Sequence, residues 1–422
     1  MNKIIVQKFG GTSVRTEENR KHALQHIKKA ISSGYKTVIV VSAMGRMGDP
    51  YATDTLLSLV DGEKTKIDKR EQDLLMSCGE IISSVVFTNM LLHNDIKAAA
   101  FTGAQAGFIT NDDFTNAKIL EIDPNRILKE LENLDAVVVA GFQGATVKGD
   151  ITTLGRGGSD TTAAALGAAL KAEWIDIFTD VEGVMTADPR VTNKARPLSV
   201  VTYNEISNLA YQGAKVIHPR AVEIAMQADV PIHVRSTYSD APGTLVTKLS
   251  RIQQGMDIKE RLVTGIAHVS DVTQINVEAK QGQMNMQEEV FRAMANEQIS
   301  VDFINISPNN VVYTVKDQLA EKAEKILLDK GYNPVLERNC AKVSVVGAGI
   351  TGVPGVASKI VSALSEQGIR ILQSADSYTT IWVLIKKDDL EKAVNALHDA
   401  FQLEDVEKDA FSIDEHSSFK TT

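Results

Sequence analysis

The sequence predicts an α/β protein in which a mainly parallel sheet, covered by helices on both faces, is followed by two small modules of mixed helices and strands. Three observations lead to this prediction. The 422 residues exceed what one hydrophobic core usually serves. Short apolar runs alternate with helical patterns in the first part of the chain, and a repeat at a 70-residue interval follows.

The strands of the first part are marked by three continuous apolar runs: IIVQKF (4–9), TVIVVSA (37–43) and AVVVAGF (136–142). Such runs are typical of strands that are buried on both faces. Helix-like segments at 16–33 and 71–92 lie between them. This alternation predicts parallel strands joined by helices.

The repeat follows the Ala241–Pro242–Gly243 turn and the polar stretch 247–260. Its matched pairs are Ile275 with Val345, Val290 with Ile360, Met294 with Leu364, Ile299 with Ile369, Val315 with Ile385 and Leu327 with Leu397. Each copy has the order strand, helix, strand, strand, helix, which resembles the ferredoxin-like βαββαβ unit. We therefore expect a first domain at 1–245, a first module at 262–338, and a second module with a C-terminal segment at 339–422.

Composition and charge narrow the function classes. A hydrophobic content of 43% and a charged content of 23% are ordinary for a soluble protein, and a net charge of −9 without a Lys/Arg block argues against nucleic-acid binding. Cys78 and Cys340 show no pairing pattern, which favours a reducing compartment. The start MNKIIVQKFGG has too short an apolar run for a signal peptide, and we expect no segment of membrane-spanning length. The prediction is a cytoplasmic protein without a membrane partner.

LGRGGSD (154–160) stands at the front of an alanine-rich helical stretch. Glycines let backbone N–H groups approach a ligand, and a helix N-terminus favours an anion. A capped helix after a flexible loop would explain Ser159 and Asp160 alone, but it leaves Arg156, whose planar fork suits a carboxylate or phosphate, unexplained. The pattern favours an anion site.

KFGGTS (8–13) follows the first strand in a similar way, with Lys8 at the strand's end and a Gly10–Gly11 turn. A turn with a solvated lysine would explain this motif by itself. However, VVSAMG (40–45) and AGFQGA (140–145) also end buried strands with small residues. Ligands bind at the carboxyl ends of strands in open α/β sheets, so these ends predict one crevice lined by backbone donors.

FTDVEGVMTADPR (178–190) adds acidic side chains after another apolar run. Asp180 and Asp188 could hold Mg²⁺ beside a phosphate, or they could belong to a solvated loop that Pro189 ends. Lys215 is a second candidate cation, and His218 before Pro219 is interpreted as a turn residue. Glu80, in SCGE, either pairs with a cation or contacts the substrate.

The glycines Gly347, Gly349 and Gly352 match the dinucleotide-binding fingerprint directly after a strand. They lie inside the second copy of the repeat, where they replace the different loop at 279–287 of the first copy. We therefore interpret them as a turn of the module. The sequence shows no Ser–His–Asp grouping and no zinc-ligand spacing, and no metal-ligand set is assigned.

With these motifs assembled, the chain resembles the aspartokinases of the amino-acid kinase superfamily. KFGGTS, VSAMG, GFQG, TLGRGGSDTTA, FTDVEGVMTADPR and GAKVIHPRA occur in the family's order over nearly the whole length. The 70-residue repeat matches the tandem ACT modules that follow the catalytic domain in that family. Within it, the chain is most similar to the diaminopimelate-regulated aspartokinase I type of spore-forming bacteria.

The resemblance implies transfer of the γ-phosphoryl group of ATP to the side-chain carboxylate of L-aspartate, giving 4-phospho-L-aspartate, with Mg²⁺. This is the first step toward diaminopimelate and lysine, threonine and methionine. A carboxylate is already an anion at pH 7, so its attack needs no general base but needs alignment and neutralising charges.

The resemblance also implies a role for each motif residue. Lys8 would stabilise the transferred phosphoryl group and Asp160 would orient Lys8. The implied aspartate pocket consists of Ser42, Thr53, Glu80, Phe142, Arg156 and Ser159, in which Arg156 binds the α-carboxylate and Glu80 the ammonium. The implied ATP site consists of Lys8, Phe9, Gly10, Gly11, Thr179, Asp180, Met185, Asp188, Arg190 and Lys215.

For regulation, the resemblance implies a homodimer through the ACT modules, with an amino-acid effector bound between them. Ser377–Tyr378–Thr379 stands where lysine-regulated relatives often have Ser-Glu-Ile, which favours diaminopimelate over lysine. Gln281, Asp302 and Asn305 are the expected effector neighbourhood, although turn and strand roles would explain them as well.

Two other functions fit parts of the pattern. Another small-molecule kinase, acting on glutamate, acetylglutamate, carbamate or UMP, would share the crevice but not this combination of motifs and modules. A catalytically silent amino-acid sensor would keep the modules, but it would not need Lys8, Lys215, Arg156 and Asp160. A bifunctional kinase–homoserine dehydrogenase would need more chain than is present.

Overall fold

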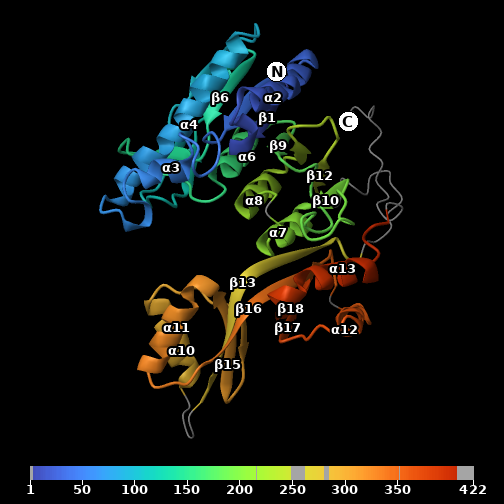
Figure 1. The fold of residues 1–422 in the computed structure, drawn as a ribbon. Helices are drawn as coiled ribbons and strands as arrows, with labels where there is room; N and C mark the ends of the chain where they lie inside the picture. Colours follow the sequence, from blue (N-terminus) through green and yellow to red (C-terminus); the bar gives the residue numbers. More distant parts are fainter. Residues whose placement is uncertain (1–2, 215, 249–261, 280–284, 351, 406–422) are drawn as a thin grey trace.

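A computed structural model describes residues 3–214, 216–248, 262–279, 285–350 and 352–405. An eight-stranded sheet forms the centre of the first domain, with the strand order β10-β12-β11-β9-β1-β2-β6-β3. Its strands β1, β6, β9, β10 and β12 are labelled in Figure 1. All of its strand pairs are parallel except β11 with β12. The sheet consists of β1 (Ile4–Phe9), β2 (Lys36–Val41), β3 (Ala98–Phe101), β6 (Ala136–Ala140), β9 (Ile175–Thr179), β10 (Val200–Thr202), β11 (Ile232–Ser236) and β12 (Thr244–Thr247).

The three apolar runs of the sequence are β1, β2 and β6, and they lie side by side in the middle of the sheet. Each is almost wholly buried, because helices cover both faces of the sheet. One face packs against α1 (Gly11–Val14), α2 (Glu17–Ser32) and α4 (Lys69–Leu92). The other packs against α5 (Asn125–Leu131), α6 (Gly158–Ala169), α7 (Tyr203–Tyr211) and α8 (Pro219–Ala228). The predicted parallel sheet sandwich is confirmed.

A smaller sheet extends the first domain beyond β6. Its strand order is β5-β4-β7-β8, and it is built from β4 (Phe108–Thr110), β5 (Ile119–Ile122), β7 (Gln143–Thr146) and β8 (Ile151–Thr153). The short helices α3 (Thr53–Ser58) and η1 (Gly62–Lys64) stand before α4. Because β8 leads through LGRGGSD into α6, this sheet places Arg156 at the N-terminus of α6.

Helix α4 corrects one expectation from the sequence. Its 24 residues are long and apolar enough, by length and composition, to cross a membrane, and it is the one such helix in the part of the chain that the structure describes. Half of its apolar window is buried inside the protein, and Phe87 and Leu91 pack fully buried against the main sheet. The apolar run is therefore explained by a core helix.

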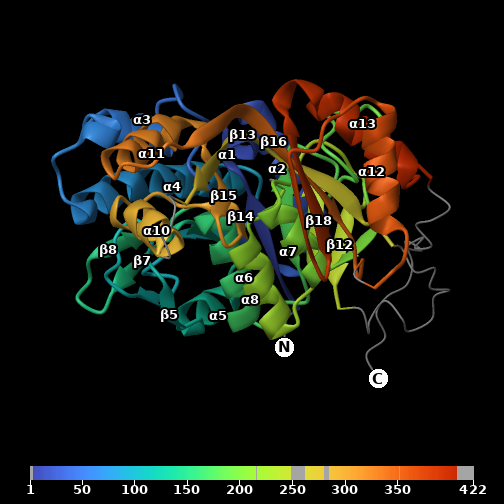
Figure 2. The same ribbon diagram turned by 90° about the horizontal axis from the view of Figure 1, so that it is seen from below.

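The two modules share one antiparallel six-stranded sheet, in the order β14-β15-β13-β16-β18-β17. Its strands are β13 (Gly265–Glu278), β14 (Asp302–Ile306), β15 (Asn310–Lys316), β16 (Val335–Val346), β17 (Gln373–Ser377) and β18 (Thr380–Lys386). Helices α10 (Met286–Asn296) and α11 (Asp317–Asp329) pack on the first half, and α12 (Val356–Glu366) and α13 (Leu390–Ala400), which follows η2 (Lys387–Asp389), pack on the second (Figure 2).

The predicted repeat is present in space, because all twelve residues of the six matched pairs are buried in the cores of the two modules. The strand pairing adds a feature that the repeat does not indicate. Residues 265–269 at the start of β13 pair with 342–346 of β16, whereas 274–276 pair with 335–337. The strand segment beside the second half of β16 therefore comes from the start of β13, inside the range expected for the first module. Strand β16 (Val335–Val346) continues through residue 338, where the sequence places the boundary between the modules. The structure does not mark an end of a module there, and the boundary stays a prediction.

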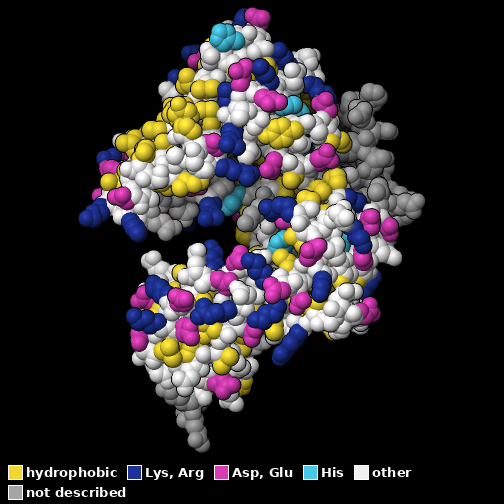
Figure 3. All heavy atoms as spheres, in the orientation of Figure 1, with side chains coloured by type: hydrophobic (Ala, Val, Ile, Leu, Met, Phe, Trp, Pro, Cys, Tyr) yellow, Lys and Arg dark blue, Asp and Glu magenta, His cyan; other side chains and the backbone are white. Residues whose placement is uncertain are grey.

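The modules join the first domain along α7. Gln212, at the end of α7, accepts hydrogen bonds at Oε1 from Trp382 Nε1 at 2.7 Å and from Ser344 Oγ at 3.1 Å. Asn208 Nδ2 donates to Thr379 Oγ1 at 2.9 Å. Away from this joint, the surface is hollowed between the first domain and the module that carries α10 and α11 (Figure 3).

Candidate active site

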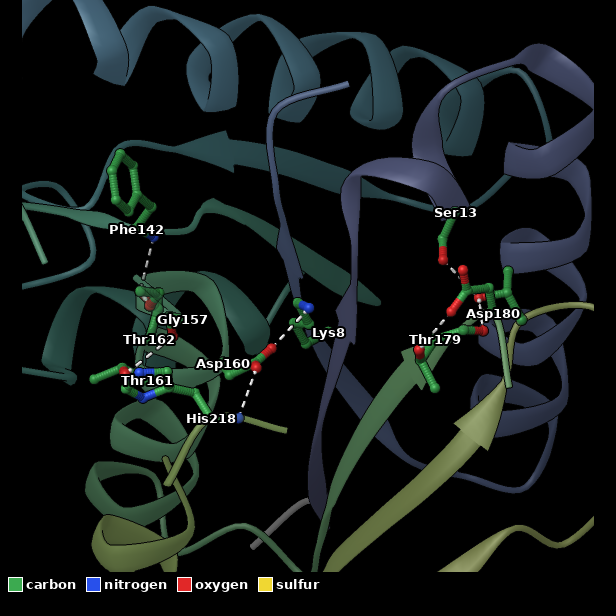
Figure 4. Close-up of polar contacts among 12 residues, drawn as sticks. Lys8, Ser13, Phe142, Gly157, Asp160, Thr161, Thr162, Thr179, Asp180 and His218 are labelled. Atoms are coloured by element: carbon green, nitrogen blue, oxygen red, sulfur yellow. Dashed lines mark hydrogen bonds and ion pairs between the residues drawn. The ribbon is translucent and has the colours of Figure 1, made fainter. Parts of the chain in front are cut away.

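Lys8 and Asp160 meet at the carboxyl end of β1. Lys8 Nζ lies 2.7 Å from Asp160 Oδ1, and each side chain is 13% exposed. The other oxygen of Asp160 accepts a hydrogen bond from the backbone N–H of His218 at 3.2 Å (Figure 4). Asp160 thus holds the lysine at the strand end from the first turn of α6.

The Gly10–Gly11 turn packs closely on the neighbouring strand end. A Cβ at Gly11 would lie 2.7 Å from the carbonyl oxygens of Ala43 and Gly45, so only glycine allows this approach. A Cβ at Gly10 would lie 3.5 Å from Lys8 Nζ, which places the ammonium directly over the turn. The turn therefore brings backbone atoms directly beside Lys8, at the place where the sequence predicts a crevice.

Phe9 lies between Lys8 and this turn, but its side chain packs into the core. It is fully buried and stacks on Phe178, with ring centroids 4.6 Å apart. Its carbonyl accepts a hydrogen bond from the backbone N–H of Ser42 at 3.2 Å. Any contact of Phe9 with a nucleotide would therefore be made by its backbone atoms.

The LGRGGSD loop presents Arg156 at the N-terminus of α6. Gly155 and Gly157 adopt positive φ values of 73° and 66° on either side of it. A Cβ at Gly157 would lie 2.2 Å from the His218 ring, so the loop is pressed against the start of α8. Arg156 is exposed and makes no hydrogen bond or ion pair with a residue that the structure describes. Its guanidinium is free to bind an anion.

Ser159 and Phe142 lie beside this loop. A Cβ at Gly141 would lie 2.8 Å from Ser159 Oγ, so the buried hydroxyl packs on the carboxyl end of β6. Phe142 has a left-handed φ of 70°, an uncommon conformation for a bulky residue. Its N–H donates to Thr162 Oγ1 at 3.0 Å, and its carbonyl accepts from Leu154 N–H at 2.8 Å. Strain of this kind is often retained at functional sites.

Glu80 is a buried carboxyl group of α4. Its Oε1 accepts a hydrogen bond from the backbone N–H of Ala43 at 3.1 Å, whereas its buried Oε2 has no hydrogen-bond partner. Burial raises the pKa of Glu80 to about 8. No ion pair joins Glu80 to any residue in the described part of the chain, so the cation-partner alternative from the sequence finds no support.

Thr53 begins α3 and is half-buried. The loop that precedes it packs on α4 beside Glu80, since a Cβ at Gly79 would lie 2.8 Å from the carbonyl oxygen of Tyr51. Ser42, also half-buried, follows β2 directly. Both lie near the elements that hold Glu80.

Five further residues expected at the nucleotide come from the end of β9 and the loop that follows it. Thr179 ends β9, and its hydroxyl donates to Asp180 Oδ1 at 3.2 Å. The Arg190 side chain donates two hydrogen bonds to Asp188, from Nε to Oδ1 at 3.0 Å and from a terminal nitrogen to Oδ2 at 2.7 Å. This pairing lowers the pKa of Asp188 and raises that of Arg190. Met185 forms an isolated β-bridge with Pro197.

The remaining predicted residues lie either in the first module or outside the described residues. Asp302 forms an ion pair with Lys342 Nζ at 2.5 Å, which joins β14 of the first module to β16. Asn305 is exposed on the same strand, β14. Lys215 and Gln281 lie outside the described residues.

Sequence reasoning missed three contacts at the site. The backbone N–H groups of His218 and Ala43 hold Asp160 and Glu80, and Arg46 pairs with Asp180 at 3.2 Å. Because every residue except proline has a backbone N–H, the sequence does not indicate the contacts made by His218 and Ala43. Arg46 directly follows the small-residue strand end VVSAMG, and this position was the available signal.

Comparisons with known proteins identify the families to which the two parts of the chain belong. Residues 3–236 match the amino acid kinase family, and residues 335–399 match the ACT domain. Aspartokinase 1 of Bacillus subtilis strain 168 is 70% identical over 401 residues, which cover 95% of this chain and 99% of that protein. This chain belongs to the aspartokinases.

Solved structures support the same assignment. The fold of this aspartokinase is similar to Escherichia coli aspartokinase III in complex with aspartate and ADP, in the R-state, with a TM-score of 0.76 at 25% identity over 94% of this chain and 99% of that one. The same enzyme with lysine and aspartate, in the T-state, gives 0.74 at 26% identity over the same shares. This aspartokinase is therefore an ATP-using aspartate kinase with a regulatory ACT region, and the predicted fold class and activity are confirmed.

Proposed function

We propose that the crevice at the carboxyl ends of β9, β1, β2 and β6 is where the γ-phosphoryl group of ATP passes to the side-chain carboxylate of L-aspartate. The contact between Lys8 and Asp160 carries this proposal, because it fixes one cation over a backbone-lined glycine turn beside a helix N-terminus. In the reaction, a carboxylate oxygen forms a bond to the γ-phosphorus while the bond from phosphorus to the ADP oxygen breaks. No proton has to be removed from the nucleophile.

Lys8 would stabilise the charge on the phosphoryl group as it moves between two anions. Its ammonium is anchored by Asp160, so little reorganisation is required when the reaction begins. Asp160 is itself fixed by the His218 N–H. The pair would therefore align the transferred group and lower the repulsion between carboxylate and polyphosphate.

The aspartate would lie between Arg156 and Glu80. Arg156 offers an uncommitted planar fork to the α-carboxylate, and Glu80 offers an unpaired buried oxygen to the ammonium. The ammonium would favour the ionised form of Glu80, which burial disfavours in the free enzyme. Ser42, Thr53, Phe142 and Ser159 would complete this pocket.

ATP would bind along the ends of β1 and β9. The proposed contacts are Lys8, the Phe9 backbone, Gly10, Gly11, Thr179, Asp180, Met185, Asp188, Arg190 and Lys215. Magnesium commonly binds through one or two carboxylates together with substrate phosphates. The described residues contain no group of three or more metal-ligating side chains. A single carboxylate, that of Asp180, is half-exposed beside the proposed crevice. It fits a Mg²⁺ that arrives with the nucleotide and is held by Asp180 directly or through water. Bound Mg²⁺ would supply further charge neutralisation.

For regulation, we propose that an amino-acid effector, diaminopimelate before lysine, binds at ACT modules paired in a homodimer. Asp302 and Asn305 on β14 lie at an edge of the shared sheet, where a second copy could pair. Gln281 precedes α10 in the same module and completes the proposed effector neighbourhood. We also propose a cytoplasmic location.

A coupled assay of ADP release tests the proposal. Aspartate should support turnover, and glutamate, acetylglutamate and carbamate should not. Repeating the assay with diaminopimelate, lysine and threonine should show inhibition by diaminopimelate. Preference for glutamate would refute the substrate assignment, whereas inhibition by lysine alone would refute only the proposed effector.

A further inference from the structure

The loop between β2 and α3 crosses the carboxyl end of β1. In the sheet, β1 lies between β9 and β2, so Asp180 and Arg46 follow strands on opposite sides of β1. A terminal guanidinium nitrogen of Arg46 lies 3.2 Å from Asp180 Oδ2. This ion pair therefore spans the strand end where Lys8 and the glycine turn lie.

The backbone of the loop is firmly held at this position. Gly45 N–H donates to Gly11 O at 3.0 Å, which ties the loop to the glycine turn. Gly45 has a φ of 90°, and a Cβ there would lie 2.3 Å from Asp49 Oδ2. That carboxylate accepts a hydrogen bond from Arg46 N–H at 2.8 Å and is also bound by Arg15. These contacts fix the root of the Arg46 side chain directly beside the proposed phosphate site.

The Arg46 guanidinium itself is lightly held. Its side chain is 72% exposed and that of Asp180 is 52% exposed. Exposed ion pairs of this kind contribute about 0–1 kcal/mol, so little opposes their separation. A polyphosphate offers the same guanidinium charge-assisted, bidentate hydrogen bonds, which are stronger.

We propose that Arg46 is a further ATP-binding residue, which leaves Asp180 when ATP binds and donates to the terminal phosphates. The proposal rests on the placement of ATP described above. In the free enzyme Arg46 pairs with Asp180 across the carboxyl end of β1. In the complex with ATP it would lie opposite Lys8, so that the phosphates contact a cation on each side.

The test is the dissociation constant of Mg²⁺-ATP without aspartate, measured by calorimetry, together with steady-state kinetics. Arg46→Ala should weaken ATP binding by about tenfold, in line with the loss of a hydrogen bond between charged groups, and leave the KM for aspartate within twofold. Arg46→Lys should have an intermediate effect. Arg15→Ala, which removes the other partner of Asp49, should stay within twofold of the wild type. An equal loss in that variant would assign the effect to loop order and overturn the proposal.

A second background separates phosphate binding from the ion pair. In Asp180→Asn the pair no longer exists, yet Arg46→Ala should still weaken ATP binding by a similar factor. If Arg46→Ala has no effect in that background, Arg46 acts only as the partner of Asp180 and the proposal is wrong. Failure of the ATP placement itself would appear differently, as a Lys8→Ala variant that keeps normal turnover.

Discussion

The hydroxyl of Thr186 lies 3.0 Å from Nε2 of the fully buried His398. Thr186 belongs to the loop that carries Asp188 and Arg190, and His398 belongs to α13 of the second module. The Thr186 carbonyl also accepts a hydrogen bond from Ile266 N–H at the start of β13, at 2.7 Å. The loop proposed to face ATP is thus bonded directly to the two elements that complete the second module. A change in that module therefore has a short physical route to the proposed nucleotide site.

Thr186→Val should weaken this connection while preserving the shape of the side chain. The substitution removes the hydroxyl that meets His398 and accepts from Arg196 N–H at 3.1 Å, and unsatisfied buried groups cost about 1–3 kcal/mol. We expect a higher KM for ATP and a higher diaminopimelate concentration for half-inhibition, measured in the coupled assay.

Lys194→Ala is the matched control for this interface. Lys194 joins the same loop region to α13 through an ion pair with Asp399 at 2.5 Å, but both side chains are substantially exposed. Such pairs contribute little, so kinetics and inhibition should stay near the wild type. Equal effects of the two variants would mean that the Thr186–His398 contact has no special part in coupling.

Lys8→Ala should lower kcat by roughly a thousandfold, because removal of one preorganised charge-stabilising donor typically costs this much. Circular dichroism and thermal unfolding should show a folded protein. Lys36→Ala is a suitable comparison, since Lys36 has a similar partly buried ion pair, with Asp135, at the amino end of the sheet. Near-normal turnover of Lys8→Ala would remove Lys8 from catalysis.

The fold and the site differ in how far the sequence predicts them. The runs that form β1, β2 and β6 are local patterns, and burial on both faces of a parallel sheet produces them directly. The exchange of strands between the modules is a non-local pairing: the repeat records which residues are buried but not which strand lies beside β16. The contact of Glu80 with Ala43 N–H escapes prediction for a similar reason, since any residue type supplies the same N–H.

Arg156→Ala should raise the KM for aspartate by roughly tenfold to a hundredfold and change the KM for ATP little, because a bidentate partner of the α-carboxylate is lost. Arg156→Lys should recover only part of this affinity, since an ammonium lacks the planar fork. Arg70→Ala, which removes an exposed arginine paired with Asp150, serves as control. An unchanged KM for aspartate with a raised KM for ATP would instead assign Arg156 to phosphate.

Glu80→Gln should make the protein more stable at pH 8 and impair aspartate binding. The raised pKa of about 8 in the folded state, against an ordinary value of 4.5, means that the folded protein binds more protons than the unfolded chain between these values. The free energy of unfolding therefore falls as pH rises from about 4.5 to 8, by on the order of a few kcal/mol, and glutamine removes this loss because it cannot ionise. Urea unfolding at pH 5.5 and pH 8 measures the difference, with Glu71→Gln on the same helix as the surface control.

The KM for aspartate of the wild type should fall as pH approaches 8, since ionised Glu80 binds the ammonium, and this dependence should be absent in Glu80→Gln. If the free energy of unfolding changes with pH in the same way in Glu80→Gln and the wild type, Glu80 is already ionised in the free enzyme. Its ionisation would then not depend on the substrate ammonium.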